Sequence, residues 1–340
     1  MSEFLKACRG EQTAYTPIWL MRQAGRYQAE YMAIKARHSF MEMCQTPELA
    51  TEVTMLPVRQ FDVDAAIIFA DILLILQPLG IGFEFTKDHG PRIERPIRQS
   101  GDVDRMASDI DVEATLGYVL QAIRMVRSEL AGKIPLIGFS GAPFTLASYV
   151  IEGGGSRDYL YTKELMYSDP GAFAALMTKI TDATIAYLSA QVAAGAQALQ
   201  VFDSWVGCLS PFDYDTYVKP HMTRLFAALP KTVPLIHFGT GNPTLYPAMA
   251  AAGGDVIGLD WRVDLGAQWR ELGDVAVMGN LDPGYLLSPR KELQAAAQRV
   301  LDSAAGRPGH IFNLGHGIFP RAPVDHVKAL IDYVHQASQR

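Results

Sequence analysis

Short apolar runs recur along the chain, each bounded by turn residues, and most are followed by a longer segment with apolar residues at helical spacing. Eight runs predict strands, at residues 18–21, 65–70, 134–139, 198–202, 233–238, 255–259, 275–278 and 310–314. Continuous apolar runs of this length are typical of parallel strands buried on both faces. The periodicity between them predicts helices at residues 112–130, 171–193, 213–229, 243–252, 264–272, 289–305 and 323–337.

Three of these helices begin with the same signal, a polar capping residue followed by proline. The pairs are Asp169-Pro170, Asn242-Pro243 and Ser288-Pro289. A capping side chain accepts a hydrogen bond from the first helical turn, where proline is tolerated because its missing N–H would have no partner.

Eight strands that alternate with helices favour a single (β/α)8 barrel of the TIM type, with residues 1–340 as one domain. Strand counting alone leaves a doubly wound sheet with additions open. Residues 81–97 alternate and carry His89-Gly90-Pro91 in their middle, which predicts a small hairpin inserted after the second strand.

Composition narrows the class of protein. The 340 residues are 49 % hydrophobic and 19 % charged, with a formal net charge of -6. An acidic chain has no general attraction for nucleic acid or anionic membranes, so neither is expected as a partner. We also expect no membrane span and no targeting peptide, because no apolar run is long enough. Three widely spaced cysteines argue against disulfides and for a reducing cytoplasm.

Polar side chains follow most of the predicted strands. In a parallel barrel the loops after the strands converge on one mouth, where functional groups gather. The residues at these positions include Arg22, Arg26, Asp71, Tyr149, Ser204 and His316. For any one of them, the alternative is that strand ends are polar simply because loops are.

Asp71 and the arginine pair are the most informative of these residues. Asp71 lies within the most apolar window of the chain, where an unpaired carboxylate would cost several kcal/mol. Arg22 and Arg26 could form structural ion pairs with acids such as Glu30, or could bind the anionic groups of a ligand. Lys35 and Arg37 lie close in sequence and add positive charge to this loop, which favours an anionic ligand.

Motifs for a metal or a cofactor are not found in the sequence. There is no His-Glu-x-x-His pair, no nucleophile elbow and no Walker lysine. Gly239-Thr240-Gly241 follows a strand, but Thr244 replaces the third glycine of a dinucleotide-binding loop. We therefore predict neither a metal site nor a cofactor.

Several segments resemble one family, the uroporphyrinogen decarboxylases. The two long signatures are PIWLMRQAGRY at residues 17–27 and GFSGAPFTLASYVIEGG at residues 138–154. Three shorter segments follow the family order, FADIL at 69–73, GNLDP at 279–283 and NLGHGI at 313–318. The resemblance spans essentially the whole chain.

The resemblance implies a homodimer of single barrels that removes CO2 from the four acetate side chains of uroporphyrinogen III without a cofactor. The product is coproporphyrinogen III, in haem biosynthesis. Arg22 and Arg26 are similar to arginines that bind substrate carboxylates, and Asp71 to the carboxylate that accepts pyrrole N–H bonds. Tyr149, Ser204 and His316 resemble residues that contact substrate side chains. The resemblance implies Asp71 and Arg22 as catalytic residues, and the proton donor could be Arg22 or a proton near Asp71.

Two other functions are weighed. A zinc-dependent corrinoid or coenzyme M methyltransferase shares the fold, but it needs a His-x-Cys where this chain reads His237-Phe238-Gly239, and a cysteine near His316. A tetrapyrrole-binding protein without catalysis is the third reading. The chain also departs from the family, because the usual RYLPEYR reads RYQAEYM at residues 26–32, followed by Lys35.

Overall fold

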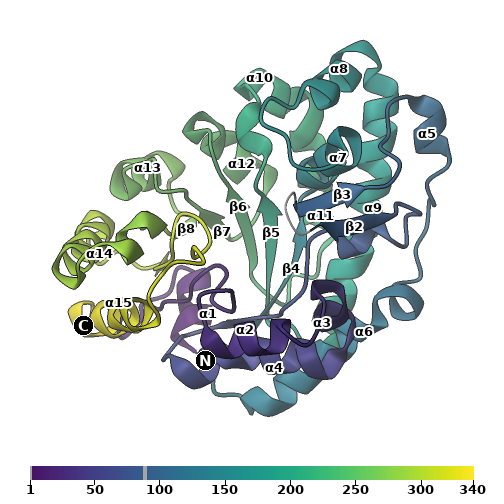
Figure 1. The fold of residues 1–340 in the computed structure, drawn as a ribbon. Coiled ribbons are helices and arrows are strands. Elements are labelled where there is room, and N and C mark those ends of the chain that lie inside the picture. The colour runs from purple at the N-terminus through teal and green to yellow at the C-terminus, as the bar shows by residue number, and fades with distance from the viewer. Residues whose placement is uncertain (1, 87–89) are drawn as a thin grey trace.

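The computed structural model describes residues 2–86 and 90–340 and contains a curved sheet of seven parallel strands (Figure 1). In sheet order these are β1 (Ala66–Ile67), β4 (Leu136–Gly141), β5 (Ala198–Asp203), β6 (Leu235–Gly239), β7 (Val256–Gly258), β8 (Ala276–Met278) and β9 (His310–Ile311). Every neighbouring pair is parallel, and strand order follows chain order.

The first predicted strand closes this sheet. Ile18 forms a parallel bridge with Phe312, just after β9. On its other side, the Ile18 carbonyl accepts a hydrogen bond from the Asp64 amide at 2.8 Å, just before β1. The segment at 18–21 therefore joins both edges of the sheet, which confirms the barrel and excludes the doubly wound alternative.

The predicted strand at 65–70 is shorter in the structure. Only β1 pairs, and the chain then turns at Asp71 into the 3-10 turn η1 (Leu74–Leu76). Leu73 and the three residues of η1 are at most 1 % exposed. The apolar character of this window thus comes from two elements, a short strand and a buried turn.

The seven predicted helices are present with small shifts in their bounds. They are α6 (Val112–Leu130), α9 (Pro170–Ala194), α11 (Lys219–Ala228), α12 (Tyr246–Ala252), α13 (Leu265–Leu272), α14 (Arg290–Ala304) and α15 (Val324–Ala337). The segment predicted at 213–229 is interrupted, because α10 (Pro211–Asp213) and a π-helical stretch (Tyr214–Val218) precede α11. A 3-10 turn (Pro243–Leu245) likewise precedes α12.

Two of the three capping predictions are confirmed. Asp169 accepts a hydrogen bond from the Ala172 amide at 2.9 Å, and Asn242 accepts one from Thr244 at 3.2 Å. The prediction for Ser288 is wrong. Its hydroxyl donates to the Tyr285 carbonyl at 2.7 Å and closes the preceding 3-10 turn (Pro283–Leu287), so that Pro289 becomes the capping residue of α14.

Further helices were not predicted. They are α1 (Glu3–Cys8), α2 (Ala29–Lys35), α3 (Phe40–Gln45), α4 (Pro47–Gln60), α5 (Ser100–Asp104), α7 (Pro143–Glu152) and α8 (Leu160–Ser168). Most are too short to show clear periodicity. Helix α1 packs Phe4 and Ala7 against Trp19 and the inward-facing residues of the strands. None of the described helices is both long enough and apolar enough to cross a membrane.

The hairpin after the second strand is confirmed. Strands β2 (Phe83–Thr86) and β3 (Gly90–Ile93) pair antiparallel, with Phe83 opposite Ile93. The turn predicted around His89 lies outside the described residues. Beyond the hairpin, Arg92 bridges Gly154, and the Ile93 amide donates to the Gly153 carbonyl at 2.9 Å. The Gly153-Gly154 segment therefore packs on the hairpin.

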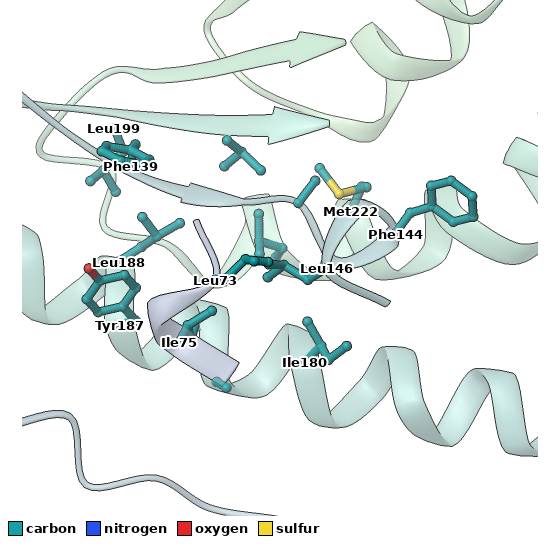
Figure 2. Packing of buried hydrophobic residues seen from close by; sticks show 14 of the residues in the cluster. Leu73, Ile75, Phe139, Phe144, Leu146, Ile180, Tyr187, Leu188, Leu199 and Met222 are labelled. Carbon is teal, nitrogen blue, oxygen red and sulfur yellow. The ribbon is translucent and has the colours of Figure 1, made fainter. Parts of the chain in front are cut away.

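Near the open end of the barrel, buried apolar side chains of the strands pack against those of the surrounding helices. Figure 2 shows side chains of β4, β5, α7, α9 and η1 together, among them Phe139, Leu199, Phe144, Leu146, Ile180, Leu188 and Ile75. Each fully buried side chain of this kind contributes about 1.5–3 kcal/mol by removing apolar surface from water. This packing fixes the segments on either side of Asp71 and the start of α7.

Candidate active site

Arg22 lies directly after the first barrel segment in an unusual backbone conformation. Its φ is 62°, in the left-handed region that side chains other than glycine rarely adopt. The turn is held by the fully buried Gln23, whose Oε1 accepts from the Leu20 amide at 3.1 Å and whose Nε2 donates to the Ala65 carbonyl at 3.1 Å. The fold thus maintains a strained backbone that projects the guanidinium outward.

The first and last strand-end loops meet around Arg22. The Ile318 amide donates to the Met21 carbonyl at 2.9 Å, and the Met21 amide donates to Asn313 Oδ1 at 3.1 Å. A Cβ on Gly317 would lie 2.4 Å from Arg22 Cδ. Glycine at position 317 therefore allows the arginine stem to rest against the backbone of the loop that carries His316.

Asp71 is half-buried at the turn between β1 and η1. Its Oδ1 accepts a hydrogen bond from the Leu73 amide at 2.9 Å. Burial raises the pKa of Asp71 to about 6, although the Leu73 hydrogen bond and the Arg22 charge both oppose this shift. A carboxylate with this pKa is mostly ionised at neutral pH, yet it retains capacity for further hydrogen bonds.

Tyr149 and Ser204 lie on the segments that follow the neighbouring strands β4 and β5. Tyr149 lies on α7, and its ring stacks on Trp205 with 3.6 Å between ring centroids. Ser204 directly precedes Trp205 after the end of β5. Burial raises the pKa of the Tyr149 phenol, and the charges of Asp71 and Arg22 act on it in opposite directions. These electrostatic contacts place Tyr149 in the same region as Arg22 and Asp71.

His316 completes this group. Burial lowers the pKa of His316, and the neighbouring Arg22 charge lowers it further. Its Nδ1 is buried and has no hydrogen-bond partner among the described residues. The ring lies edge-on to Trp261, with 6.0 Å between centroids. A neutral imidazole with a free nitrogen can donate to or accept from a ligand, depending on its tautomer.

Arg26 lies near Tyr31. It is exposed on the loop before α2, and its charge acts on Tyr31, whose pKa is raised mainly by burial. Among residues 2–86 and 90–340, neither Arg22 nor Arg26 forms an ion pair with a carboxylate, Glu30 included. The interpretation of the pair as structural ion pairs is therefore not supported, and both guanidinium groups remain accessible.

The departure from the family motif has a structural role. Gln28 is fully buried, and its Oε1 accepts from the Gly25 amide at 2.9 Å while its Nε2 donates to Gln60 at 2.9 Å. Gln28 thus orders the loop that carries Arg26. Met32, at the position of a family arginine, is 44 % exposed and adds no charge.

Several residues near the mouth were not selected from the sequence. Trp205, Gln23 and Tyr31 have no charge, so only their positions beside Ser204, Arg22 and Arg26 could have suggested them. Asp260, by contrast, is buried but satisfied, because Arg262 and the Gly241 amide both donate to its Oδ2. Arg262 in turn stacks over Trp261 at 3.8 Å.

Two further features bear on ligands. A cavity of about 280 Å³ lies beside α13 and α14, and none of the six predicted site residues lines it. Within the described part of the chain, no group of three or more His, Cys, Asp or Glu side chains is arranged to hold a metal ion.

Comparison with known proteins places this site in a family context. Residues 1–337 match the family model described as uroporphyrinogen decarboxylase (URO-D). The uroporphyrinogen decarboxylase of Carboxydothermus hydrogenoformans is 57 % identical over 98 % of this chain and 96 % of its own length. That of Sorangium cellulosum is 55 % identical over 98 % of this chain and 95 % of its own.

Solved structures share the fold at low identity. A methyltransferase from Methanosarcina mazei has a TM-score of 0.83 at 19 % identity, with 98 % of both chains covered. A putative vitamin-B12-independent methionine synthase from Listeria monocytogenes has a TM-score of 0.59 at 10 % identity, again over 98 % of both chains. With the match over residues 1–337 and relatives more than half identical along nearly their whole length, the chain belongs to the uroporphyrinogen decarboxylase family.

Proposed function

We propose that the protein is a uroporphyrinogen decarboxylase that converts uroporphyrinogen III to coproporphyrinogen III by removing CO2 from four acetate side chains. The observation that carries this proposal is that the half-buried Asp71 lies near Arg22, although the two form no ion pair. Arg22 has no carboxylate partner among the described residues. A cation and an anion are thus both available to one ligand. A porphyrinogen offers carboxylates to the arginine and pyrrole N–H groups to the aspartate.

The reaction needs an electron sink, because the C–C bond of a pyrrole acetate leaves its electron pair behind. Protonation of the adjacent ring carbon gives an iminium-like cation that can accept this pair. CO2 then leaves, the exocyclic carbon takes up a proton to become a methyl group, and the ring proton is released. Each cycle therefore consumes one proton overall. A fixed carboxylate beside the ring nitrogens stabilises the cation as it forms, which is electrostatic preorganisation.

The remaining site residues have binding roles in this proposal. Arg22 and Arg26 hold substrate carboxylates, for which planar guanidinium groups are well suited. Tyr149, Ser204 and His316 contact side chains of the ring. The unpartnered Nδ1 of His316 supports this role, because a buried polar atom without a partner gains from a ligand.

The proton donor is either Arg22 or a proton held near Asp71. The two donors make different demands on Asp71, whose pKa is about 6: a proton delivered by Asp71 requires its protonated form, whereas donation from Arg22 leaves Asp71 ionised throughout. A guanidinium is a very weak acid by comparison. Asp71 must nevertheless be ionised when the ring becomes cationic.

The assembly is proposed to be a homodimer of single barrels spanning residues 1–340. Large apolar side chains are exposed together on α8 and α10, where Leu160 is 68 % exposed and Phe212 is 73 % exposed. Tyr167 of α8 joins the two helices by donating to Asp213 at 3.1 Å. Such a patch is typical of a protein interface. The three cysteines are free thiols, which fits a reducing cytoplasm.

The deciding experiment is anaerobic incubation of the purified protein with uroporphyrinogen III. We expect products with seven, six, five and finally four carboxylates to appear in order, measured by chromatography after oxidation to porphyrins. A preparation from the same host without the expressed chain controls for the host's own enzyme.

Other outcomes would support other functions. Tight binding of the porphyrinogen without CO2 release would indicate a tetrapyrrole-binding protein. Zinc-dependent methyl transfer to a thiol, without decarboxylation, would indicate the methyltransferase. Either result would contradict the proposed reaction.

A further inference from the structure

A buried carboxyl group lies at the end of β5, outside the set of proposed substrate contacts. Asp203 is fully buried, and its Oδ1 accepts a hydrogen bond from the Thr145 hydroxyl at 2.9 Å. Its Oδ2 has no partner among the described residues. Burial raises the pKa of Asp203 to about 7, against the effect of the Thr145 hydrogen bond. Such a group is costly to bury, which calls for an explanation of its place here.

The Thr145 hydroxyl makes two hydrogen bonds, one to Asp203 and one from Trp205, which together are called the Thr145 relay. Thr145 lies in the first turn of α7, and its Oγ1 also accepts a hydrogen bond from the Trp205 amide at 3.2 Å. An amide N–H can only donate, so the single hydroxyl proton is free to point at Asp203. The hydroxyl therefore contacts the residues on both sides of Ser204.

The relay connects two proposed substrate contacts. Tyr149 lies one turn after Thr145 on α7, on the same face of the helix. Its ring stacks on Trp205, and the backbone amide of Trp205 donates to the Thr145 hydroxyl. The Thr145 hydroxyl thus links α7, which carries Tyr149, to the segment that carries Ser204.

Attachment of α7 to the barrel does not require this hydroxyl. Phe144, Leu146 and Val150 of α7 are all 0 % exposed in the core. The Ala142 amide, just before the helix, also donates to the Phe202 carbonyl at 2.8 Å. Apolar packing therefore docks the helix, and the relay can act on its fine orientation.

We propose that Thr145 and Asp203 are positioning residues that hold Tyr149 and Ser204 in register for the side chains of the porphyrinogen. This inference rests on the proposed function, which supplies the ligand. Neither residue is proposed to touch the substrate itself.

The test compares Thr145→Val with Thr145→Ser. Valine removes the hydroxyl at nearly constant volume, and we expect the KM for uroporphyrinogen III to rise about tenfold, the scale of one lost hydrogen bond. The kcat should change much less, because the chemistry at Asp71 is untouched. Serine restores the hydroxyl, so its KM should return to within about twofold of the wild-type value.

A matched control separates positioning from stability. Thr184 on α9 is equally buried, and its hydroxyl donates to the Ile180 carbonyl at 2.8 Å within its own helix. Thr184→Val should lower the melting temperature without changing KM. The fluorescence of Trp205, obtained as the difference from Trp205→Phe, should change in Thr145→Val because the stacked tyrosine moves, and should not change in Thr184→Val.

The outcomes are distinguishable. A wild-type KM in a folded, active Thr145→Val variant would overturn the inference, as would an equal rise in KM in Thr184→Val. Thr145→Ser that fails to recover the KM would also contradict it. No CO2 release from the wild-type protein would instead contradict the proposed function, and an unchanged Trp205 signal in Thr145→Val would still refute the positioning role.

Discussion

An aspartate lies at each end of the barrel near the first strands, and the two differ in how many hydrogen bonds the fold supplies to them. At the N-terminal end of the strands, Asp64 accepts hydrogen bonds from the Tyr15 hydroxyl at 2.8 Å, the Ile18 amide at 2.7 Å and His335 at 2.7 Å. At the other end, the Asp71 carboxylate accepts a hydrogen bond from the Leu73 amide, and no other donor to it is found in residues 2–86 and 90–340. The first carboxylate is saturated by the fold, and the second keeps capacity for a ligand.

The charged residues near the two aspartates differ in the same way, because those near Asp64 have partners and those near Asp71 have none in the described part of the chain. His335 on α15 lies beside Asp64 and within 3.6 Å of Asp62, so the last helix is tied to the segment that closes the barrel. Arg22 and Arg26 have no such partners among the described residues. The fold thus pairs Asp64 with His335 but leaves the charges of Arg22 and Arg26 available to a ligand.

The largest expected effect comes from Asp71→Asn. We expect kcat to fall about 100- to 1000-fold, the range found when a preorganised electrostatic group is removed, with a smaller change in KM. The melting temperature should not fall, because the buried charge is itself unfavourable at this position. Asp64→Asn is the matched variant and should show the reverse, with lower stability and normal kcat. Unchanged turnover in Asp71→Asn would remove Asp71 from the mechanism.

The second effect concerns stability. Asp64→Ala leaves the buried Ile18 amide without its acceptor, and we expect a loss of roughly 2–4 kcal/mol in the free energy of unfolding. Asp62 is the control, since its side chain is 89 % exposed although it lies near the same histidine. Asp62→Ala should change stability by less than about 1 kcal/mol in chemical denaturation. Equal losses in both variants would contradict the assignment of Asp64 to the fold.

The pH dependence of activity tests the same aspartate at the mouth. Asp71 must be ionised to stabilise a cation, and its pKa is about 6. We expect kcat/KM to fall about tenfold per pH unit below this value and to level off above it. Asp71→Asn should lose this acidic limb while keeping any limb that arises from substrate carboxylates. A rate that instead falls above pH 6 would identify the proton at Asp71 as the one delivered to the ring.

Removing Arg22 or Arg26 should affect KM, whereas removing the nearby Arg37, whose side chain donates to a backbone carbonyl, should not. Arg22→Ala and Arg26→Ala are each expected to raise KM about tenfold, with the larger effect at Arg22 because it also lies near Asp71 and His316. Arg37 is the control, since it donates to the Ala33 carbonyl at 3.4 Å within the same segment. Arg37→Ala should have a normal KM. Normal values in all three variants would return the pair to a structural role.

The smallest effect is a pH dependence of stability at the N-terminal end. Burial alone would lower the pKa of His335, but the hydrogen bond and charge of Asp64, with Asp62 and Asp332, raise it above 6.5. The contribution of protonated His335 is therefore complete below pH 6.5 and is lost as pH rises through the folded-state pKa. We expect the free energy of unfolding to fall over this pH range in the wild-type protein, measured by chemical denaturation, and no such fall in His335→Phe.

The barrel could be predicted from the sequence because buried parallel strands appear as continuous apolar runs. Long amphipathic helices such as Val112–Leu130 and Val324–Ala337 are equally clear, because their apolar residues recur at helical spacing. Sequence reasoning missed short helices such as Phe40–Gln45, which span too few residues to be periodic, and it misassigned Ser288, where two turns compete for one hydroxyl.

The site was predicted in part. Charged residues stand out in an apolar context, so Arg22 and Asp71 could be selected from the chain alone. Which of them meet is a matter of three-dimensional packing, and the structure groups Arg22, Asp71, Tyr149 and His316 while leaving Arg26 beside Tyr31. The role of Thr145 depends on contacts with residues about 60 positions away, which no local pattern encodes.

The left-handed backbone conformation of Arg22 lowers the stability of the fold, whereas its guanidinium group is needed for ligand binding. An arginine in this conformation costs roughly 1–2 kcal/mol that glycine would not. A laboratory search for thermostable variants would therefore tend to select glycine at position 22, and those variants would lose the guanidinium group. Screening for heat resistance alone would therefore favour variants that bind the substrate more weakly, so engineering of this chain should keep arginine at position 22.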